Sequence, residues 1–140
     1  MEDLKVKRLH PMAQIPTRAT TGSAGYDLYA VNTEEIFPYE ISRIPIGIAV
    51  ELPEGYYGQI SCRSSLAIRK LTTLGGVIDN DYRGEIYVTL MNHSDSIIKI
   101  FAGMRVGQII CIPYAKCNVV EVAHLSNTTR CEKGFGSSGQ

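Results

Sequence analysis

The chain has 140 residues, enough for one domain with a core of its own. Apolar residues make up 44% and charged residues 20%, a balance that excludes wholesale disorder, and no apolar run approaches the ~18 residues of a membrane-spanning helix. Fourteen basic and fourteen acidic residues cancel, which argues against a general nucleic-acid coat, so any bound anion must meet a local cluster.

The N-terminal residues lack an apolar segment behind a basic one, so no secretory signal is predicted. We therefore expect an intracellular protein, cytoplasmic or nuclear, that binds neither a membrane nor nucleic acid directly. The histidines are scattered and the cysteines form no Cys-x-x-Cys pair. Free thiols, and no zinc site, are expected at Cys62, Cys111, Cys117 and Cys131.

Short strand patterns follow one another along the chain. Residues 44–52 alternate large apolar residues with smaller or polar ones, which predicts a strand with one face on a core. Turn clusters separate further predicted strands at residues 59–62, 85–92, 97–101, 106–112 and 119–122. Many short strands at close spacing indicate an all-β domain, either a sandwich, a jelly roll or a small barrel.

Two of these segments carry additional signals. Residues 85–92 are at least partly apolar on both faces, so we expect a second sheet or another subunit to cover the outer face. Residues 64–70 are the only predicted helix, with a serine as N-cap and cations in the last turn.

Residues 75–84, read Gly-Gly-Val-Ile-Asp-Asn-Asp-Tyr-Arg-Gly, combine turn formers with chemically active side chains. Glycine, Asn and Asp tolerate left-handed backbone and predict a tight hairpin. A plain solvated turn would explain most of the segment. Tyr82, however, is an aromatic residue where a turn tip is normally small and polar, so a binding hairpin is an equal alternative.

The C-terminal residues lose the strand pattern and become rich in glycine and serine. They could be a frayed terminus. Phe135 between two glycines, with Arg130 before it, is also typical of an arm that becomes ordered on an anionic ligand. We therefore divide the chain into a single β domain at residues 1–125 and a flexible arm at residues 126–140.

Three other segments have a ligand-binding character. Arg63, Ser64 and Ser65 stand at a strand-to-helix junction, where amides, hydroxyls and a guanidinium group can face a phosphate, although such a junction often only caps its helix. Gln108 is a polar insertion in an apolar strand pattern. Asp27 is an acid within a small and apolar run, where it could cap a turn or stand near a metal.

In order and spacing, these segments resemble the five motifs of the trimeric dUTP nucleotidohydrolases, the dUTPases, over nearly the whole chain. The motifs correspond to residues 24–30, 63–67, 76–84 with their continuation, 103–108 and 130–139. The resemblance implies a jelly-roll-like, distorted β-barrel of many short strands with one short helix. It also implies a homotrimer, in which three chains share each active site.

The activity implied by the resemblance is Mg-dependent hydrolysis of dUTP to dUMP and pyrophosphate, which keeps uracil out of DNA and supplies dUMP for thymidylate synthesis. Asp79 is the implied catalytic base for water attacking the α-phosphorus. Asp27 would reach Mg²⁺ through water, with the substrate phosphates holding most of the ion. The implied substrate-binding residues are Arg63, Ser64, Ser65, Gly76, Val77, Ile78, Tyr82, Gln108, Arg130, Phe135, Gly136, Ser137 and Ser138.

Within that set, Tyr82 would pack under the deoxyribose and reject ribonucleotides, while the backbone of the hairpin reads uracil. The chain departs from the family pattern at several positions, including Ser65, Tyr87 and Met104, but it keeps the charged groups that the chemistry needs. Substrate affinity, not reaction type, is the property that these departures would change.

Two rival functions remain open at this point. A dCTP deaminase has a similar fold and substrate, but that family uses a glutamate where this chain has Thr89, and no zinc-deaminase signature replaces it. A catalytically inactive β-barrel that binds nucleotides or protein partners would have little need for the complete set of site residues.

Overall fold

A computed structural model describes residues 2–136 of the chain. They form short strands and one short helix, which confirms the all-β prediction. No helix in this range is long and apolar enough to span a membrane. The elements in chain order are β1 (Lys5–Arg8), β2 (Tyr26–Tyr29), β3 (Glu34–Ile36), β4 (Ile41–Pro45), β5 (Ile48–Glu51), β6 (Tyr56–Ser61), α1 (Ser64–Ile68), β7 (Leu71–Thr73), β8 (Val77–Ile78), β9 (Tyr87–Asn92), β10 (Ile98–Ile100) and β11 (Arg105–Pro113).

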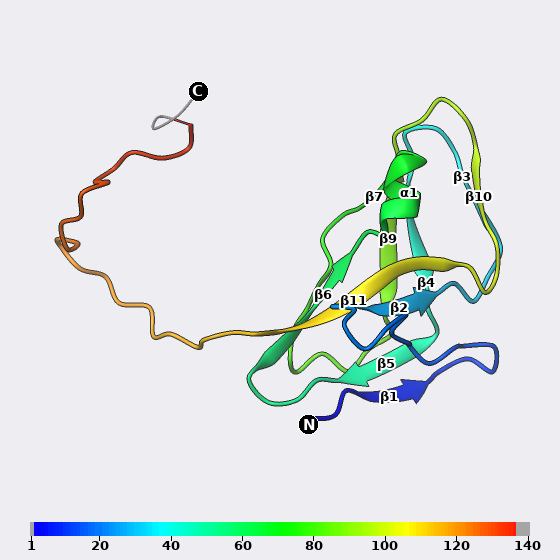
Figure 1. The fold of residues 1–140 in the computed structure, drawn as a ribbon, viewed down its shortest axis with the longest axis horizontal. Helices are drawn as coiled ribbons and strands as arrows, with labels where there is room; N and C mark the ends of the chain where they lie inside the picture. The colour runs from blue at the N-terminus through cyan, green and yellow to red at the C-terminus, as the bar shows by residue number, and fades with distance from the viewer. Residues whose placement is uncertain (1, 137–140) are drawn as a thin grey trace.

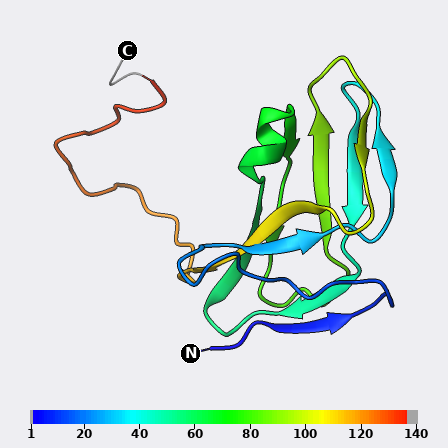
Figure 2. The same cartoon turned by 45° about the vertical axis from the view of Figure 1, so that its right-hand side comes forward.

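The strands pair in four antiparallel sheets, and in the described part of the chain they do not close into a single barrel. The largest sheet has the order β2-β11-β6-β8, and a second has the order β4-β9-β7. The two remaining sheets are the pairs β1-β5 and β3-β10. Figure 1 shows β2 and β11 crossing the body beside the upright strands β4 and β9. The helix α1 contacts β7, and Figure 2 shows it at one side of the upright strands.

One hydrophobic core holds these sheets together. Residues of one face of β9, such as Val88 and Leu90, meet residues of β4, β5 and β11 there. The side chains with the least exposed surface are Leu28, Ile36, Ile44, Ile46, Ile48, Leu71, Ile86, Val88, Leu90, Ile100, Val106 and Ile109. Burial of branched aliphatic side chains on one side of each strand is the main stabilising contribution in such a fold.

The single strand predicted at residues 44–52 is wrong, because the chain changes sheets in its middle. β4 pairs with β9, whereas β5 pairs with β1. The break falls at Gly47, whose φ of +73° favours glycine, and a Cβ there would lie 2.9 Å from Val31 Cγ1. The alternating pattern was continuous because both halves contribute apolar residues to the same core.

The helix is shorter than predicted and begins differently. It ends at Ile68, and Arg63, not a serine, occupies the N-cap position without any side-chain capping bond. The last turn contains no basic residue. Ser64 and Ser65 are therefore exposed on the first turn instead of closing the helix end.

β9 occupies the centre of its sheet, with Val88, Leu90 and Asn92 buried on one face. Its other face, with Tyr87, Thr89 and Met91, is half-buried, and the Arg43 guanidinium carbon lies 4.3 Å from the centroid of the Tyr87 ring. Within one chain, the outer face of β9 is thus only partly covered.

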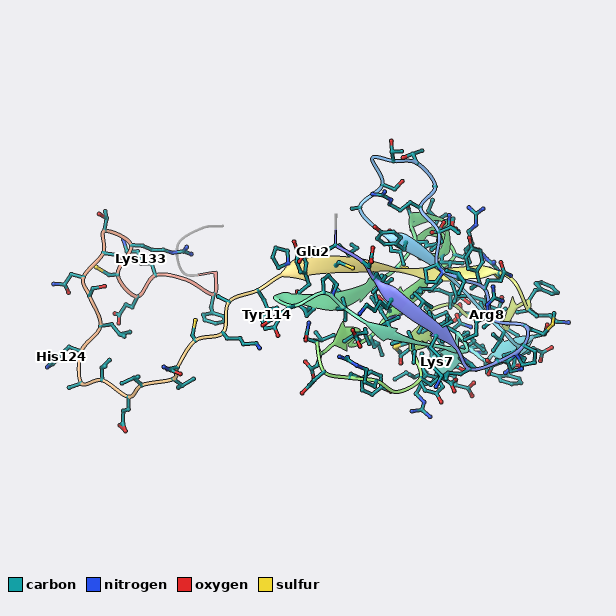
Figure 3. All side chains as sticks on the ribbon, turned by 90° about the horizontal axis from the view of Figure 1, so that it is seen from below. Glu2, Lys7, Arg8, Tyr114, His124 and Lys133 are labelled. Carbon is teal, nitrogen blue, oxygen red and sulfur yellow. The ribbon has the colours of Figure 1, made fainter. Side chains whose placement is uncertain are left out.

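The strand predicted at residues 119–122 is wrong for the described chain. No strand follows β11, and Val119 and Val120 are largely or fully exposed. Figure 1 shows the chain running away from the body after β11, and Figure 3 labels Tyr114 at the departure point, with His124 and Lys133 far along the tail. Residues 119–122 thus have the alternating apolar pattern of a strand but pair with no strand of the β domain.

A buried asparagine fixes the connection between β9 and β10. The Asn92 side-chain amide donates to the carbonyl oxygens of Ile36 at 2.9 Å and Ser96 at 2.8 Å. Its carbonyl oxygen accepts from the Ser94 amide at 2.9 Å and from the Ser94 hydroxyl at 2.7 Å. All its polar atoms are thus satisfied while the residue is fully buried.

We predict that Asn92→Ala lowers the free energy of unfolding by about 2–4 kcal/mol, because it removes the side-chain hydrogen bonds to the buried Ile36 carbonyl and to the partly buried Ser94 amide and leaves a cavity at a fully buried position. Urea unfolding at fixed protein concentration measures this change. Asn127→Ala, in the exposed tail, is the matched control and is expected to change stability by less than about 0.5 kcal/mol. Equal stability of the two variants would contradict the structural role assigned to Asn92.

Candidate functional site

Residues from three distant parts of the sequence line one cleft, which we call the β2–β11 cleft. Its volume is about 250 Å³. The sequence-predicted site residues in its wall are Asp27, Arg63, Ser64, Ser65 and Gln108, and the wall is completed by Ala19, Ser23 and Gly25. Strand pairing brings these segments together, because β11 pairs with β2 on one side and with β6 on the other. Gln108 is therefore level with both Asp27 and Ser61.

Asp27 lies between two guanidinium groups and is only 8% exposed. Its Oδ1 is 3.4 Å from Arg63 Nε, and its Oδ2 is 3.8 Å from Arg105 Nη1. One carboxylate against two arginines leaves a surplus of positive charge beside the cleft. This local surplus suits an anionic ligand although the whole chain is neutral.

Gln108 is fixed by a hydrogen bond and by a glycine. Its Nε2 donates to the Cys62 carbonyl at 3.2 Å. Across the cleft wall, a Cβ built on Gly25 would lie 2.8 Å from Gln108 Cδ, closer than real Cβ contacts allow. Gly25 is thus the residue that leaves room for the Gln108 side chain, a relation that the sequence did not reveal.

A second cleft, the β8–β9 cleft, contains the hairpin residues of the sequence prediction. Its wall includes Val77, Ile78, Asp79 and Tyr82, together with Arg43, Glu85, Tyr87 and Thr89. The Tyr82 hydroxyl donates to the Glu85 carbonyl at 2.7 Å. The ring lies so close to Gly84 that a Cβ there would be 2.6 Å from Tyr82 Cζ. The second glycine of the segment therefore allows the tyrosine to fold back over its own loop.

The predicted hairpin is better described as an edge strand followed by a turn. β8 pairs with β6 and not with β9, so residues 75–84 do not form a β8–β9 hairpin. Gly75 and Gly76 have φ of +65° and +99°, and a Cβ on Gly76 would lie 2.6 Å from the Ile60 carbonyl oxygen. Glycine is required at Gly76 both for its backbone conformation and for this approach to β6.

Asn80 has a larger role than the turn shape that its residue type suggests. Its side-chain amide donates to the carbonyls of Pro53 at 3.0 Å and Tyr56 at 2.8 Å. These bonds fasten the turn to the connection between β5 and β6. The adjacent Asp79 is thereby held at the border of the β8–β9 cleft.

The two clefts lie on opposite edges of one sheet. β2 and β8 are the edge strands of the order β2-β11-β6-β8, so three interstrand spacings, about 14 Å, separate them. Asp27 is level with Ser61, whereas Ile78 pairs with Gly58, three residues before Ser61 on β6. One chain therefore does not bring Asp79 together with Arg63 and Gln108.

The predicted arm residues that the structure describes, Arg130, Phe135 and Gly136, line neither cleft. Arg130 Nε donates to the Lys133 carbonyl at 2.7 Å, a local contact within the tail. Phe135 is fully exposed, and Gly136 has φ of +89°. Ser137 and Ser138 lie outside the described residues.

No group of three or more His, Cys, Asp or Glu side chains with metal-binding geometry occurs among residues 2–136. The hard oxygen donors of the β2–β11 cleft are the Asp27 carboxylate and the hydroxyls of Ser23, Ser64 and Ser65. One carboxylate fits an ion that a ligand's phosphates hold for the most part, because Mg²⁺ is commonly bound through one or two carboxylates plus substrate phosphates.

All four cysteines are free thiols, as the sequence predicts. Burial raises the pKa of the Cys62 and Cys111 thiols. Both groups therefore stay protonated near neutral pH and are poor nucleophiles. Cys62 instead donates to the Leu71 carbonyl at 3.3 Å beside the Arg63 junction.

Comparison with known proteins identifies the family of the chain. A dUTPase family profile matches residues 12–139. The deoxyuridine 5'-triphosphate nucleotidohydrolase of Hydrogenobaculum sp. (strain Y04AAS1) is 46% identical over 140 residues, with 97% of each chain covered. The enzyme of the same name from Picosynechococcus sp. (strain ATCC 27264 / PCC 7002 / PR-6) is 40% identical over 139 residues, with 97% of this chain and 98% of that protein covered.

Solved structures show the same likeness. The Staphylococcus bacteriophage 80alpha dUTPase with dUpNHpp has a TM-score of 0.94 and 28% identity, with both chains covered completely. A mutant dUTPase from phage phi11 of S. aureus, described for its coordination of a structural Mg(II) ion, has a TM-score of 0.82 and 25% identity over 90% of this chain. The fold, the family profile and the named relatives together define the class as an all-β nucleotide hydrolase. The chain belongs to the dUTPase family.

We predict that Gly25→Ala destabilises the protein by about 1–3 kcal/mol and moves the Gln108 amide away from the Cys62 carbonyl, because the new methyl group overlaps the Gln108 side chain. Urea unfolding measures the loss, and a crystal structure of the variant shows the displacement. The double variant Gly25→Ala, Gln108→Ala should recover part of the stability by removing the overlap. If the double variant is as unstable as the sum of the single variants, the overlap is not the cause.

Proposed function

We propose that this chain is a dUTP diphosphatase that hydrolyses dUTP to dUMP and pyrophosphate through attack of water on the α-phosphorus. The observation that carries the proposal is the division of the site residues into two complementary clefts. One has a surplus of positive charge and hydroxyl donors for a triphosphate. The other presents a carboxylate and an aromatic ring for a base, a sugar and a water molecule.

The functional unit of this proposal is a homotrimer whose subunits share each site. The β8–β9 cleft of one subunit meets the β2–β11 cleft of a second, and the arm of a third closes over both. Three features support this arrangement: the clefts lie on opposite edges of one sheet, the outer face of β9 is only partly covered, and the tail up to residue 136 pairs with no strand of its own chain. Three-fold symmetry repeats such a contact three times and gives three equivalent sites.

Arg63, Ser64, Ser65 and Gln108 would bind the triphosphate. Arg63 is suited to this role because Asp27 holds its guanidinium group at the cleft wall. Asp27 would also hold Mg²⁺ through water, and the bound ion would neutralise phosphate charge during the reaction. Fixed donors and cations around the phosphates stabilise the charge that develops in the transition state.

Asp79 would orient the attacking water and accept its proton. A carboxylate is adequate for this task, because phosphoryl transfer depends more on alignment and charge stabilisation than on a strong base. Tyr82, folded back over Gly84, would pack under the deoxyribose and exclude a 2′-hydroxyl. The backbone at Gly76, Val77 and Ile78 would read the polar edge of uracil, with β8 at a sheet edge where backbone groups are accessible.

Residues 126–140 would act as the arm that completes the site, with residues 1–125 as the domain that carries it. Phe135 would stack on uracil, Arg130 would meet the phosphates, and Gly136, Ser137 and Ser138 would wrap the γ-phosphate. Closure of the arm would exclude water from the reacting centre. The exposed, locally bonded tail is consistent with an arm that has no docking position on its own subunit.

The direct test is pyrophosphate release from dUTP, dTTP, dCTP and UTP in the presence of magnesium. We expect rapid turnover of dUTP and a kcat/KM at least about 100-fold lower for the other three, because a closed pocket penalises an added methyl, amino or hydroxyl group. Release of ammonia from dCTP would instead support the deaminase alternative. Absence of dUTP turnover would refute the proposal.

The shared site can be tested by mixing two inactive variants. Asp79→Asn and Arg63→Ala are each expected to lose at least about 100-fold in kcat, whereas Asp81→Asn, two residues after Asp79 in the same turn, keeps most activity. After joint refolding at equal amounts, random trimers should regain about a quarter of the wild-type activity, because that fraction of sites pairs an intact Asp79 with an intact Arg63 of the neighbour. A site confined to one chain would regain nothing.

A further inference from the structure

The turn that contains Asp79 and Tyr82 is fastened on one side by an arginine. Arg83 Nη1 donates to the Asn80 carbonyl at 2.7 Å and to the Tyr82 carbonyl at 3.3 Å. A guanidinium group can make such contacts in a fixed planar geometry. Arg83 therefore sets the position of the backbone on both sides of Asp81, between the carboxylate and the aromatic ring of the β8–β9 cleft.

Arg83 is itself oriented by two charged side chains on neighbouring strands, Lys5 of β1 and Glu51 of β5. Its Nε lies 3.7 Å from Glu51 Oε1 at the end of β5, and Glu51 Oε2 accepts from Lys5 Nζ of β1 at 3.1 Å. Lys5 and Glu51 face each other in the β1–β5 register, and Figure 1 shows β1 running along β5 at the edge of the body. The hydrogen bond and charge of Lys5, and then the charge of Arg83, lower the pKa of Glu51, so Glu51 is ionised near neutral pH.

The opposite side of the turn is fastened independently. Hydrogen bonds from the Asn80 side-chain amide to the Pro53 and Tyr56 carbonyls hold the turn to the β5–β6 connection. Arg83 and Asn80 thus restrain the same few residues from two directions. Loss of one restraint would leave the turn attached but free to rotate about the other.

Exposed ion pairs contribute little to global stability, and all three charged groups are roughly half exposed or more. Their effect on a reaction can be larger, because a displacement of about 1 Å at a catalytic group can reduce the rate about 100-fold. An interaction of this kind therefore changes turnover more than it changes the unfolding transition.

We propose that Arg83, oriented by Glu51 and Lys5, is a positioning residue that holds Asp79 and Tyr82 in their working geometry, and that β1 is in this way coupled to the active site. The inference rests on the proposed dUTP hydrolysis. It adds residues outside the two clefts to those on which turnover depends.

The experiment compares Arg83→Met, Arg83→Lys and Glu51→Gln with the wild type in dUTP and UTP turnover. Arg83→Met is expected to reduce kcat/KM for dUTP about 10–100-fold, mainly through kcat, and to narrow the ratio of dUTP to UTP turnover, because both Asp79 and Tyr82 move. Arg83→Lys should restore part of the loss. Glu51→Gln should reduce kcat/KM for dUTP about 2–5-fold in the wild type. It should cause no further reduction in Arg83→Met, since the two substitutions remove the same contact.

Lys7→Met is the matched control. Lys7 lies on β1 with Lys5 and lines the same surface groove as Lys5, Glu51 and Arg83, so the substitution removes one positive charge from this groove without touching the turn. It is expected to keep kcat/KM within about 2-fold of the wild type. The inference is overturned if kcat/KM for dUTP in Arg83→Met stays within 2-fold of the wild type, or if Lys7→Met reduces kcat/KM as much as Arg83→Met does. Additive effects of Glu51→Gln and Arg83→Met on kcat/KM would also overturn it. Should Arg83→Met fail to fold, the cycle of Arg83→Lys with Glu51→Gln gives the same decision.

Binding of dUpNHpp by calorimetry separates this inference from the proposed function. If the wild type neither binds the analogue nor hydrolyses dUTP, the proposed function fails. If the wild type does both and the Arg83 variants match it in kcat and in the dUTP to UTP ratio, only the positioning role fails. A lower melting temperature with unchanged kinetics likewise assigns Arg83 a structural role and overturns the proposal.

Discussion

The site depends most on the double pairing of β11. This nine-residue strand bonds to β2 on one side and to β6 on the other, so it aligns three segments that are far apart in the sequence. Gly107 permits the close fit, because a Cβ there would lie 3.3 Å from both the Ser61 carbonyl and Val88 Cγ1. Without this alignment Asp27, Arg63 and Gln108 would have no common cleft.

The same sheet also separates the two halves of the chemistry. Its edge strand β2 carries Asp27, which we assign to the phosphate site, and its other edge strand β8 leads to Asp79, which we propose as the catalytic base. Because an antiparallel sheet keeps its edges apart, a single chain cannot bring Asp79 onto a phosphate held by Arg63. Assembly is thus a chemical requirement of the proposed reaction, in addition to any stability that it provides.

Sequence reasoning located the side chains that line the two clefts better than it located the strands. Tyr82 and Gln108 stood out because each departs from the local pattern, whereas Asp79 and Arg63 received their roles from the family resemblance. The structure places these four residues in two clefts. Their split between two sheet edges could not be read from residue types, because strand order depends on long-range pairing. The family resemblance, and not periodicity, indicated the shared site.

The errors have physical causes. Residues 44–52 were read as one strand because alternation records burial and not the identity of the partner, which changes at Gly47. Residues 119–122 alternate in the same way without a partner in their own chain. The contacts of Asn92, Asn80 and Arg83 carried no sequence signal at all, because each joins a side chain to backbone carbonyls, some of them far along the chain.

The attachment of the tail has a consequence for the rate at which a site can close. The Tyr114 backbone amide donates a hydrogen bond to the Gly55 carbonyl at 3.0 Å, and the Tyr114 ring packs edge-on against the Tyr57 ring with 5.9 Å between the centroids, so Tyr114 is fixed to the body. From that point to residue 136 the chain can extend by up to about 70 Å. A tether of this length keeps each arm at a local concentration on the order of millimolar around neighbouring sites. In the proposed trimer, an arm can therefore dissociate fully from the site so that product leaves, and it can rebind without a diffusional search because it stays tethered nearby.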